Sequence, residues 1–236
     1  MTSKQKVIAI IPARSGSKGL KNKNLKLFNN KPLIFYPINA AIESGVVDNV
    51  LVTTDSKKIA DIAKKYGAEV PFLRSKKLSG DLATTENTLK DALLKYEKFK
   101  NVKYNICVFL TATDVFRKVE WIKDCVKILK SNKKYESVFS GHKTHKNFWI
   151  FEKKKWSRLK PFMKIYASRQ VKKSILREDT GLSCASRAYL WRKGRRIGDK
   201  VKILSNDDSF TSLDIHNLED FKLAEYAYKL RYGNRK

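Results

Sequence analysis

Short apolar runs alternate with segments of helical periodicity along most of the chain. The apolar runs predict strands at 6–11, 49–54, 68–73, 104–110, 135–139 and 201–204. The helical segments are 32–44, 56–66, 85–99, 119–129 and 218–232. Run 104–110 is continuously apolar from Ile106 to Leu110, as expected of a central parallel strand that is covered on both faces. Repeated strand–helix units predict a three-layer α/β fold of Rossmann-like type, with a mainly parallel sheet and a ligand at the carboxyl ends of its strands.

The regular alternation stops after Gly141. Segment 142–177 is irregular and mixes aromatic residues with many cations. We interpret it as an insertion or pairing arm within a single domain spanning 1–236, because no repeat, linker or low-complexity segment divides the chain. Trp149 and Trp156 then belong to a subunit interface or a small separate core. The interleaved lysines leave stacking on single-stranded nucleic acid as an alternative, but no recognised nucleic-acid module surrounds them.

The composition is that of a folded but very basic protein. Hydrophobic residues make up 42% of the 236 positions, so a packed core is expected and disorder is not. The net charge of +28 is compatible with nucleic acid, an anionic surface or a small polyanionic substrate. Because the lysines are spread from end to end, a solvated surface accounts for most of them, and we expect no specific nucleic-acid partner.

Cysteine usage and hydropathy bear on the cellular compartment. Cys107, Cys125 and Cys184 lie far apart and form no zinc-binding spacing. This sparse, odd number favours a reducing cytoplasm. Arg14 ends the first apolar stretch before a secretion signal is complete, and no run approaches the roughly 18 apolar residues of a membrane span. We therefore expect a cytoplasmic location and no membrane contact.

The chemistry is indicated most directly by the segment that follows the first predicted strand. Within 14–24 the chain places two glycines, small hydroxyl residues and four cations. Glycines let backbone N–H groups approach phosphate oxygens, and Lys and Arg balance their charge. The spacing of Gly16 and Gly19 matches neither a Walker A loop nor a dinucleotide fingerprint. The alternative, an ordinary surface loop in a lysine-rich chain, explains the order of these residues less well.

This order resembles the N-terminal signature of the acylneuraminate cytidylyltransferase family, whose members make CMP-activated sialic, legionaminic or pseudaminic acid. Further motifs extend the resemblance over almost the whole chain, least clearly from 141 to 200. The matching segments are 13–24, 31–33, 52–55, 66–70, 74, 81–85, 212–216 and 220–225. The resemblance implies that CTP and an acidic keto-sugar react by nucleotidyl transfer, in which a sugar hydroxyl displaces pyrophosphate. It also implies a homodimer that pairs through the arm.

The same resemblance assigns residues to the nucleotide. Arg14, Lys18 and Lys23 are the implied catalytic cations on the triphosphate. The remaining implied nucleotide-binding residues are Ser17, Gly19, Asn24, Arg74, Asp81, Thr84 and Thr85. A surface arginine is the alternative for Arg74, and a helix N-cap is the alternative, or an additional role, for Asp81, Thr84 and Thr85.

Metal binding is implied at the last strand end. Asp214 is the expected ligand of Mg²⁺, which prefers carboxylate and phosphate oxygens. Where the family has a second Asp, this chain has His216, a better ligand for softer metals. Three explanations stay open: Asp214 and the nucleotide suffice, the preference has shifted toward Mn²⁺, or activity is impaired.

The sugar site departs from the family more strongly. Thr111 stands where the family has Gln, and the flanking prolines of the family are absent from 110–117. His145 matches a His-containing turn of the sugar site, and Arg169 with Gln170 matches the family's Arg-Gln pair. We therefore expect a cytidylyltransferase for an acidic sugar that can differ from sialic acid. The alternatives are a catalytically altered CTP-binding relative, a nucleotidyltransferase with another acceptor, or a basic nucleic-acid-binding protein.

Overall fold

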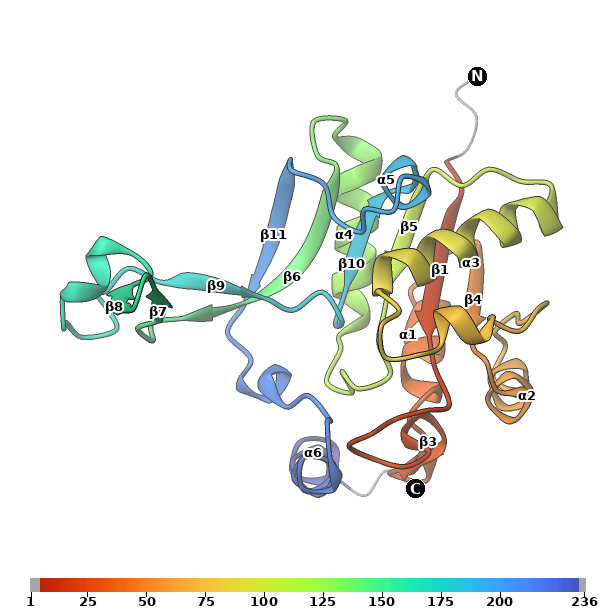
Figure 1. Ribbon diagram of the computed structural model, residues 1–236, viewed down its shortest axis with the longest axis horizontal. Helices are drawn as coiled ribbons and strands as arrows, with labels where there is room; N and C mark the ends of the chain where they lie inside the picture. The colour runs from red at the N-terminus through yellow and green to blue at the C-terminus, as the bar shows by residue number, and fades with distance from the viewer. Residues whose placement is uncertain (1–4, 234–236) are drawn as a thin grey trace.

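A computed structural model describes residues 5–233, which form a mixed α/β fold with one projecting arm (Figure 1). Within these residues seven strands make the main sheet, in the order β11-β6-β10-β5-β1-β4, with β9 paired to β6. Their bounds are β1 Val7–Pro12, β4 Asn49–Thr53, β5 Ile106–Phe109, β6 Ser137–Thr144, β9 Ile175–Glu178, β10 Cys184–Arg187 and β11 Val201–Asn206. β1 pairs in parallel with both β4 and β5, and β11 in parallel with β6. The predicted mainly parallel sheet is confirmed.

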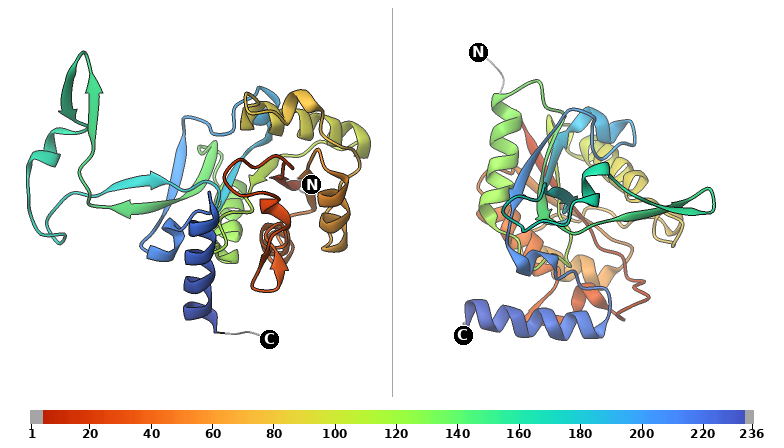
Figure 2. Two further views of the ribbon diagram at one scale, coloured as in Figure 1. Left: turned by 60° about the horizontal axis from the view of Figure 1, so that its bottom comes forward. Right: turned by 90° about the vertical axis from the view of Figure 1, so that its left-hand side faces the viewer.

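Helices cover both faces of this sheet. Their bounds are α1 Phe35–Glu43, α2 Lys57–Lys65, α3 Thr85–Lys100, α4 Val119–Ser131, α5 Ala188–Arg192 and α6 Leu218–Tyr232. In β1, Val7 packs in one core cluster with residues of α1, α2, α4 and α6, whereas Ile8 faces a second cluster with α3 and α5. This alternation follows from the two-residue period of a strand, and it produces the predicted three layers. Two views of the layers are given in Figure 2.

Two expected elements differ in the structure. Segment 68–73 contributes only a single bridge, Leu51 to Glu69, because Pro71 has no N–H group to continue a ladder. Pro32 does not open a helix; it lies in β3 (Lys31–Pro32), paired with β2 (Leu27–Phe28), and α1 begins three residues later. The hairpin turns at Asn29 and Asn30, whose φ angles of 44° and 63° suit the left-handed conformation that Asn tolerates.

Strand β10 was not predicted. It runs antiparallel between β5 and β6, although its sequence, Cys-Ala-Ser-Arg, is not an apolar run. Its polar side chains are satisfied internally, since the hydroxyls of Ser186 and Ser137 form a buried hydrogen bond of 2.8 Å. Cys107, Cys125 and Cys184 are all buried and free.

The arm is an ordered extension of the sheet. β6 and β9 continue past the other strands and lead to a hairpin of β7 (Trp149–Glu152) and β8 (Lys155–Arg158). In Figures 1 and 2 this hairpin stands well away from the helices. Its aromatic rings remain largely in solvent: Phe151 is 57% exposed and Trp156 is 66% exposed, although the two rings contact each other. The segment is therefore neither a free loop nor a closed core of its own.

None of the helices within residues 5–233 is both long and apolar enough to cross a bilayer. The parallel strands β1, β4, β5, β6 and β11 all end at one edge of the sheet. The chain passes from β1 to β4 on one side and later returns to β5 on the other. Such a change of direction opens a crevice at the carboxyl ends of the strands, where α/β proteins bind ligands.

Candidate active site

The cationic loop of residues 13–24 directly follows β1 and occupies this crevice. Its shape is fixed from within, because Asn24 is buried and its Nδ2 donates to the carbonyl of Arg14 at 2.9 Å. On one side, the backbone and hydroxyl of Ser15 donate to Asp55 after β4. On the other side, Gly19 lies so close to the chain before α6 that an added Cβ would be 2.3 Å from the carbonyl oxygen of His216. A side chain cannot be accommodated there without moving backbone.

A cleft of about 320 Å³ lies on the β4 side of the loop; we call it the Arg74 cleft. Its lining includes Arg14, Arg74, Asp81, Thr85 and Thr88. The structure thus brings together predicted site residues from three separate segments of the chain. The cleft is polar and is bounded by the first turn of α3, whose N–H groups and dipole favour an anion.

Arg74 is buried, so the surface-arginine alternative is wrong. Its side chain is 8% exposed, its backbone N–H donates to Thr54, and its Nε donates to Ser79 at 3.2 Å. Burial lowers the pKa of Arg74, and the nearby Asp55 carboxylate partly compensates. Nη2 of Arg74 is buried without a hydrogen-bond partner among the described residues. A buried guanidinium with a spare N–H group at a cleft is suited to a carbonyl or phosphate oxygen.

Asp81 holds two of the predicted catalytic cations. Its carboxylate contacts Arg14 Nη1 at 3.0 Å and Lys18 Nζ at 2.7 Å. Hydrogen bonds from Lys18 and then Arg14 lower the pKa of Asp81. All three side chains are substantially exposed, so a ligand of higher negative charge can replace Asp81 at modest cost. Ser17 lies in the same loop and is half-buried.

Thr84 and Thr85 divide two roles between them. Thr84 is the N-cap of α3, since its hydroxyl accepts from the N–H of Asn87 at 3.2 Å. Thr85 lines the Arg74 cleft. The capping alternative therefore holds for Thr84, and the cap places Thr85 at the mouth of the cleft.

A second cleft of about 470 Å³ lies on the β5 side of the loop; we call it the Asp214 cleft. Loops after β5, β9 and β11 build it, together with the chain after α5. Its lining includes Phe109, Thr111, Asp114, Arg177, Glu178, Asp179, Thr180, Gly181, Arg196, Asp214 and His216. Three of the predicted residues, Thr111, Asp214 and His216, are thus brought together.

Lys23 connects the loop with the Asp214 segment. Its Nζ donates to the carbonyl of Ile215 at 2.9 Å. Burial lowers the pKa of Lys23, while the charge of Asp214 opposes that shift. This bond ties the cationic loop to the residue that directly follows Asp214.

Asp214 has the properties of a metal ligand. Its Oδ2 lies 3.2 Å from Nε2 of His216, which is 73% exposed. Its Oδ1 is buried and accepts no hydrogen bond from the described residues. Within residues 5–233 no three His, Cys, Asp or Glu side chains gather into a metal cage. This donor set fits Mg²⁺, which takes one or two carboxylates and completes its coordination with phosphate oxygens and water.

Asp114 is a functional candidate that sequence reasoning missed. The hydroxyl of Thr111 donates to its carboxylate, and Gly181 packs directly against both side chains. Burial raises the pKa of Asp114 to about 6 despite the charge of Arg117. Arg117 is itself buried and donates to the carbonyls of Gly181 at 2.6 Å and Leu182 at 2.5 Å. Asp114 and Arg117 thus fix the wall of the cleft, through Thr111 and through the carbonyls of Gly181 and Leu182.

The three other predicted sugar residues lie outside the lining of both clefts. His145 follows the end of β6, and Arg169 and Gln170 are exposed in the arm. The cleft cations are instead Arg177 and Arg196. No local motif marks these two arginines, because the pairing of β9 with β6 and the chain return after α5 bring them to the cleft.

The layered fold places the cationic loop between two clefts at the carboxyl ends of the parallel strands, an arrangement suited to an anionic ligand. The chain belongs to the cytidylyltransferase family, whose model matches residues 8–229. It is 43% identical over 125 residues to the CMP-N,N'-diacetyllegionaminic acid synthase of Legionella pneumophila. This match covers 53% of each chain. It is 33% identical over 220 residues to the N-acylneuraminate cytidylyltransferase of Escherichia coli O18:K1:H7, over 93% of this chain and 51% of that protein.

The match thus spans about half the length of these two curated relatives. A structural neighbour is CMP:2-keto-3-deoxy-manno-octonic acid synthetase in complex with CTP. It has a TM-score of 0.70 and 14% identity, and the match covers 96% of this chain and all of that one. At this identity the likeness concerns the fold.

Proposed function

We propose that the protein transfers CMP from CTP to a hydroxyl of an acidic keto-sugar of the nonulosonic class, releasing pyrophosphate. The observation that carries this proposal is the position of the cationic loop between the two clefts, with Lys23 bonded to the Asp214 segment. The family and the names of the sequence relatives support the reaction type. CTP occupies the Arg74 cleft and the sugar occupies the Asp214 cleft.

Positioning and charge neutralisation do most of the work in phosphoryl-type transfer. Arg14 and Lys18 exchange their contact with Asp81 for the triphosphate. Lys23 faces the α-phosphate, and its ammonium neutralises the charge that develops as the sugar oxygen attacks. Asn24 maintains the loop conformation through the Arg14 carbonyl.

Asp214 would hold Mg²⁺ through its buried Oδ1, and the triphosphate and water would supply the other ligands. When bound, Mg²⁺ neutralises phosphate charge and orients the triphosphate. His216 contacts Asp214 and is otherwise exposed, so it would act on the metal through Asp214 and not as a direct ligand. Mn²⁺ is the alternative if the imidazole binds metal directly.

We also propose a cytoplasmic homodimer that pairs through the arm. Rings that stay exposed on an ordered hairpin, such as Phe151 and Trp156, support an apolar interface. Static light scattering at micromolar concentration tests this; a monomer contradicts it.

Thermal shift with CTP, ATP, GTP and UTP in the presence of Mg²⁺ tests the nucleotide assignment. CTP should raise the melting temperature most, since a ligand that binds only the folded state stabilises it. Pyrophosphate release with CTP and sialic, legionaminic or pseudaminic acid then tests the reaction. Equal stabilisation by all four nucleotides refutes the cytidylyl assignment.

A further inference from the structure

The Asp214 cleft poses an electrostatic question. Its described lining has four carboxylates, Asp114, Glu178, Asp179 and Asp214, but only two arginines, Arg177 and Arg196. An acidic acceptor needs a cation there whose charge is not already neutralised by the protein. The contacts of the two arginines differ in this respect.

Arg177 is committed to a partner within the protein. Its Nε and Nη2 contact the two oxygens of Asp179 at 2.7 and 3.0 Å, in the two-pronged geometry of a strong pair. The Asp179 side chain is only 8% exposed, so separating the pair would leave a carboxylate without its counter-charge in a partly dry site.

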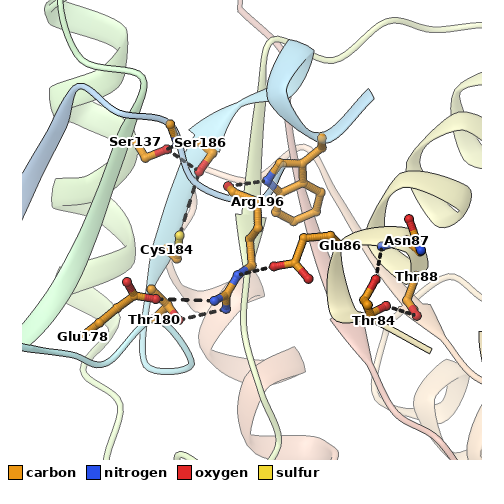
Figure 3. A network of polar contacts seen from close by, with 12 residues as sticks. Thr84, Glu86, Asn87, Thr88, Ser137, Glu178, Thr180, Cys184, Ser186 and Arg196 are labelled. Atoms are coloured by element: carbon orange, nitrogen blue, oxygen red, sulfur yellow. Dashed lines mark hydrogen bonds and ion pairs between the residues drawn. The ribbon is translucent and has the colours of Figure 1, made fainter. Parts of the chain in front are cut away.

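Arg196 has weaker ionic contacts. Its Nη2 is 3.4 Å from Glu178 and its Nε is 3.7 Å from Glu86, both longer than the 2.7–2.9 Å of a good charged hydrogen bond (Figure 3). Its short bond, Nη1 to the hydroxyl of Thr180 at 2.9 Å, goes to a neutral group. Glu86 and Glu178 are 40% and 49% exposed, so both can turn to solvent without being buried as charges.

Arg196 is also held in place by an aromatic ring and by backbone hydrogen bonds. Its guanidinium lies 4.8 Å from the centroid of the Phe109 ring, and its backbone carbonyl accepts from Trp191 Nε1 at 3.0 Å. The N–H of Gly198 donates to Ser137, which anchors the same turn. A planar cation held by ring stacking and a fixed backbone loses little entropy when it binds a carboxylate.

We propose that Arg196 binds the carboxylate of the acceptor and thereby makes the Asp214 cleft selective for acidic sugars. This inference rests on the proposed function. Thr180 supports the guanidinium from one side and Phe109 from its face, while Glu86 and Glu178 balance its charge before the acceptor enters. Arg196 is thus a specificity-determining residue, and the contact with CTP does not depend on it.

The test compares an acid with its uncharged methyl ester. Wild type, Arg196→Gln and Arg196→Lys are assayed for pyrophosphate release with CTP and whichever of sialic, legionaminic or pseudaminic acid is turned over best. Arg196→Gln should lower kcat/KM for the acid at least roughly tenfold, but for the ester less than about threefold. Arg196→Lys should recover part of the loss, because it keeps the charge but not the planar fork. The KM for CTP should stay within about twofold.

Arg195→Gln is the matched control. Arg195 is the neighbouring residue, pairs with Asp199 at 2.9 Å and is not among the described residues of the cleft lining. The Arg195→Gln variant should have the wild-type kcat/KM for both the acid and its ester. Melting temperatures check that each variant is folded.

Equal losses for acid and ester overturn the inference, as does a large change in the KM for CTP. If wild type turns over none of the three acids, the proposed function fails and the inference is tested by calorimetry. The acids are then titrated into the CTP-bound protein with Ca²⁺ in place of Mg²⁺. Absence of acid binding, or binding that Arg196→Gln leaves unweakened, also overturns the role of Arg196.

Discussion

Gly19→Ala changes one of the closest backbone contacts around the loop. A Cβ at this position would lie 2.3 Å from the carbonyl oxygen of His216 and 3.2 Å from its carbonyl carbon. Both are backbone atoms, so no side chain can rotate away. The loop and the segment before α6 must therefore separate.

The size of the separation follows from the contact. Carbon and oxygen need at least about 3.0 Å, so the two backbones move apart by about 0.7 Å. Lys23 spans the same junction through its 2.9 Å bond to Ile215 and would be displaced from the Asp214 segment. Because a misplacement of about 1 Å can cost about a hundredfold in rate, we expect kcat to fall at least roughly tenfold. Overpacking of this kind costs about 1–3 kcal/mol in stability.

Gly16→Ala is the matched comparison, since its Cβ would have no neighbour within 4 Å. Pyrophosphate release under saturating CTP and acceptor, together with melting temperature, is measured for both variants. Gly19→Ala should lose activity and melt several degrees lower, whereas Gly16→Ala should lose less than about threefold. Equal losses would mean that backbone freedom of the loop matters and that the contact with His216 does not. Normal activity of Gly19→Ala would refute the steric reasoning.

Three further predictions concern charged groups. Lys23→Ala and Arg14→Ala should each lower turnover at least roughly tenfold with the fold intact, because each removes charge that balances the phosphates; normal turnover of both would show that the loop takes no part in the reaction. Asp214→Asn should abolish activity, whereas His216→Asp should keep or raise it with Mg²⁺, and assays with Mg²⁺ and Mn²⁺ compare them; an active Asp214→Asn would place the metal elsewhere. Asp114 has a folded-state pKa of about 6, above its unfolded value near 4, so it destabilises the fold as pH rises through this window. The melting temperature of Asp114→Asn should therefore rise relative to that of wild type as the pH increases from 4 to 7. Plots of melting temperature against pH that run parallel for the two proteins would contradict this.

The parts of the molecule that sequence reasoning predicted depend on local rules. An apolar run that ends in glycines and lysines specifies both β1 and the loop after it, since strand burial and phosphate binding each need those residue types nearby. The central position of β5 followed from its unbroken apolar run. Thr84 was identifiable as a cap because capping requires a hydroxyl immediately before a helix.

The parts that were missed depend on pairing between distant segments. β10 carries no apolar signature, and its place between β5 and β6 is set by partners 45 to 81 residues away along the chain, such as Ser137 and Ile106. The two-residue hairpin turn at Asn29–Asn30 did have a local signal, namely two residues that tolerate positive φ. Pro32, which follows it, was instead assigned to a helix start.

The acceptor cleft shows why site prediction is harder than fold prediction. Arg177 comes from a strand that pairs with the extended end of β6, and Arg196 comes from the turn after α5. Neither has a sequence motif, because its chemistry depends on contacts made after folding. Arg177 is neutralised by Asp179, whereas the ionic contacts of Arg196 with Glu86 and Glu178 are long. The resemblance pointed to the arm for an acceptor cation, at Arg169. A cation already fixed at the cleft of the same chain is the more economical explanation for an acidic acceptor, and the acid–ester comparison at Arg196 separates the two.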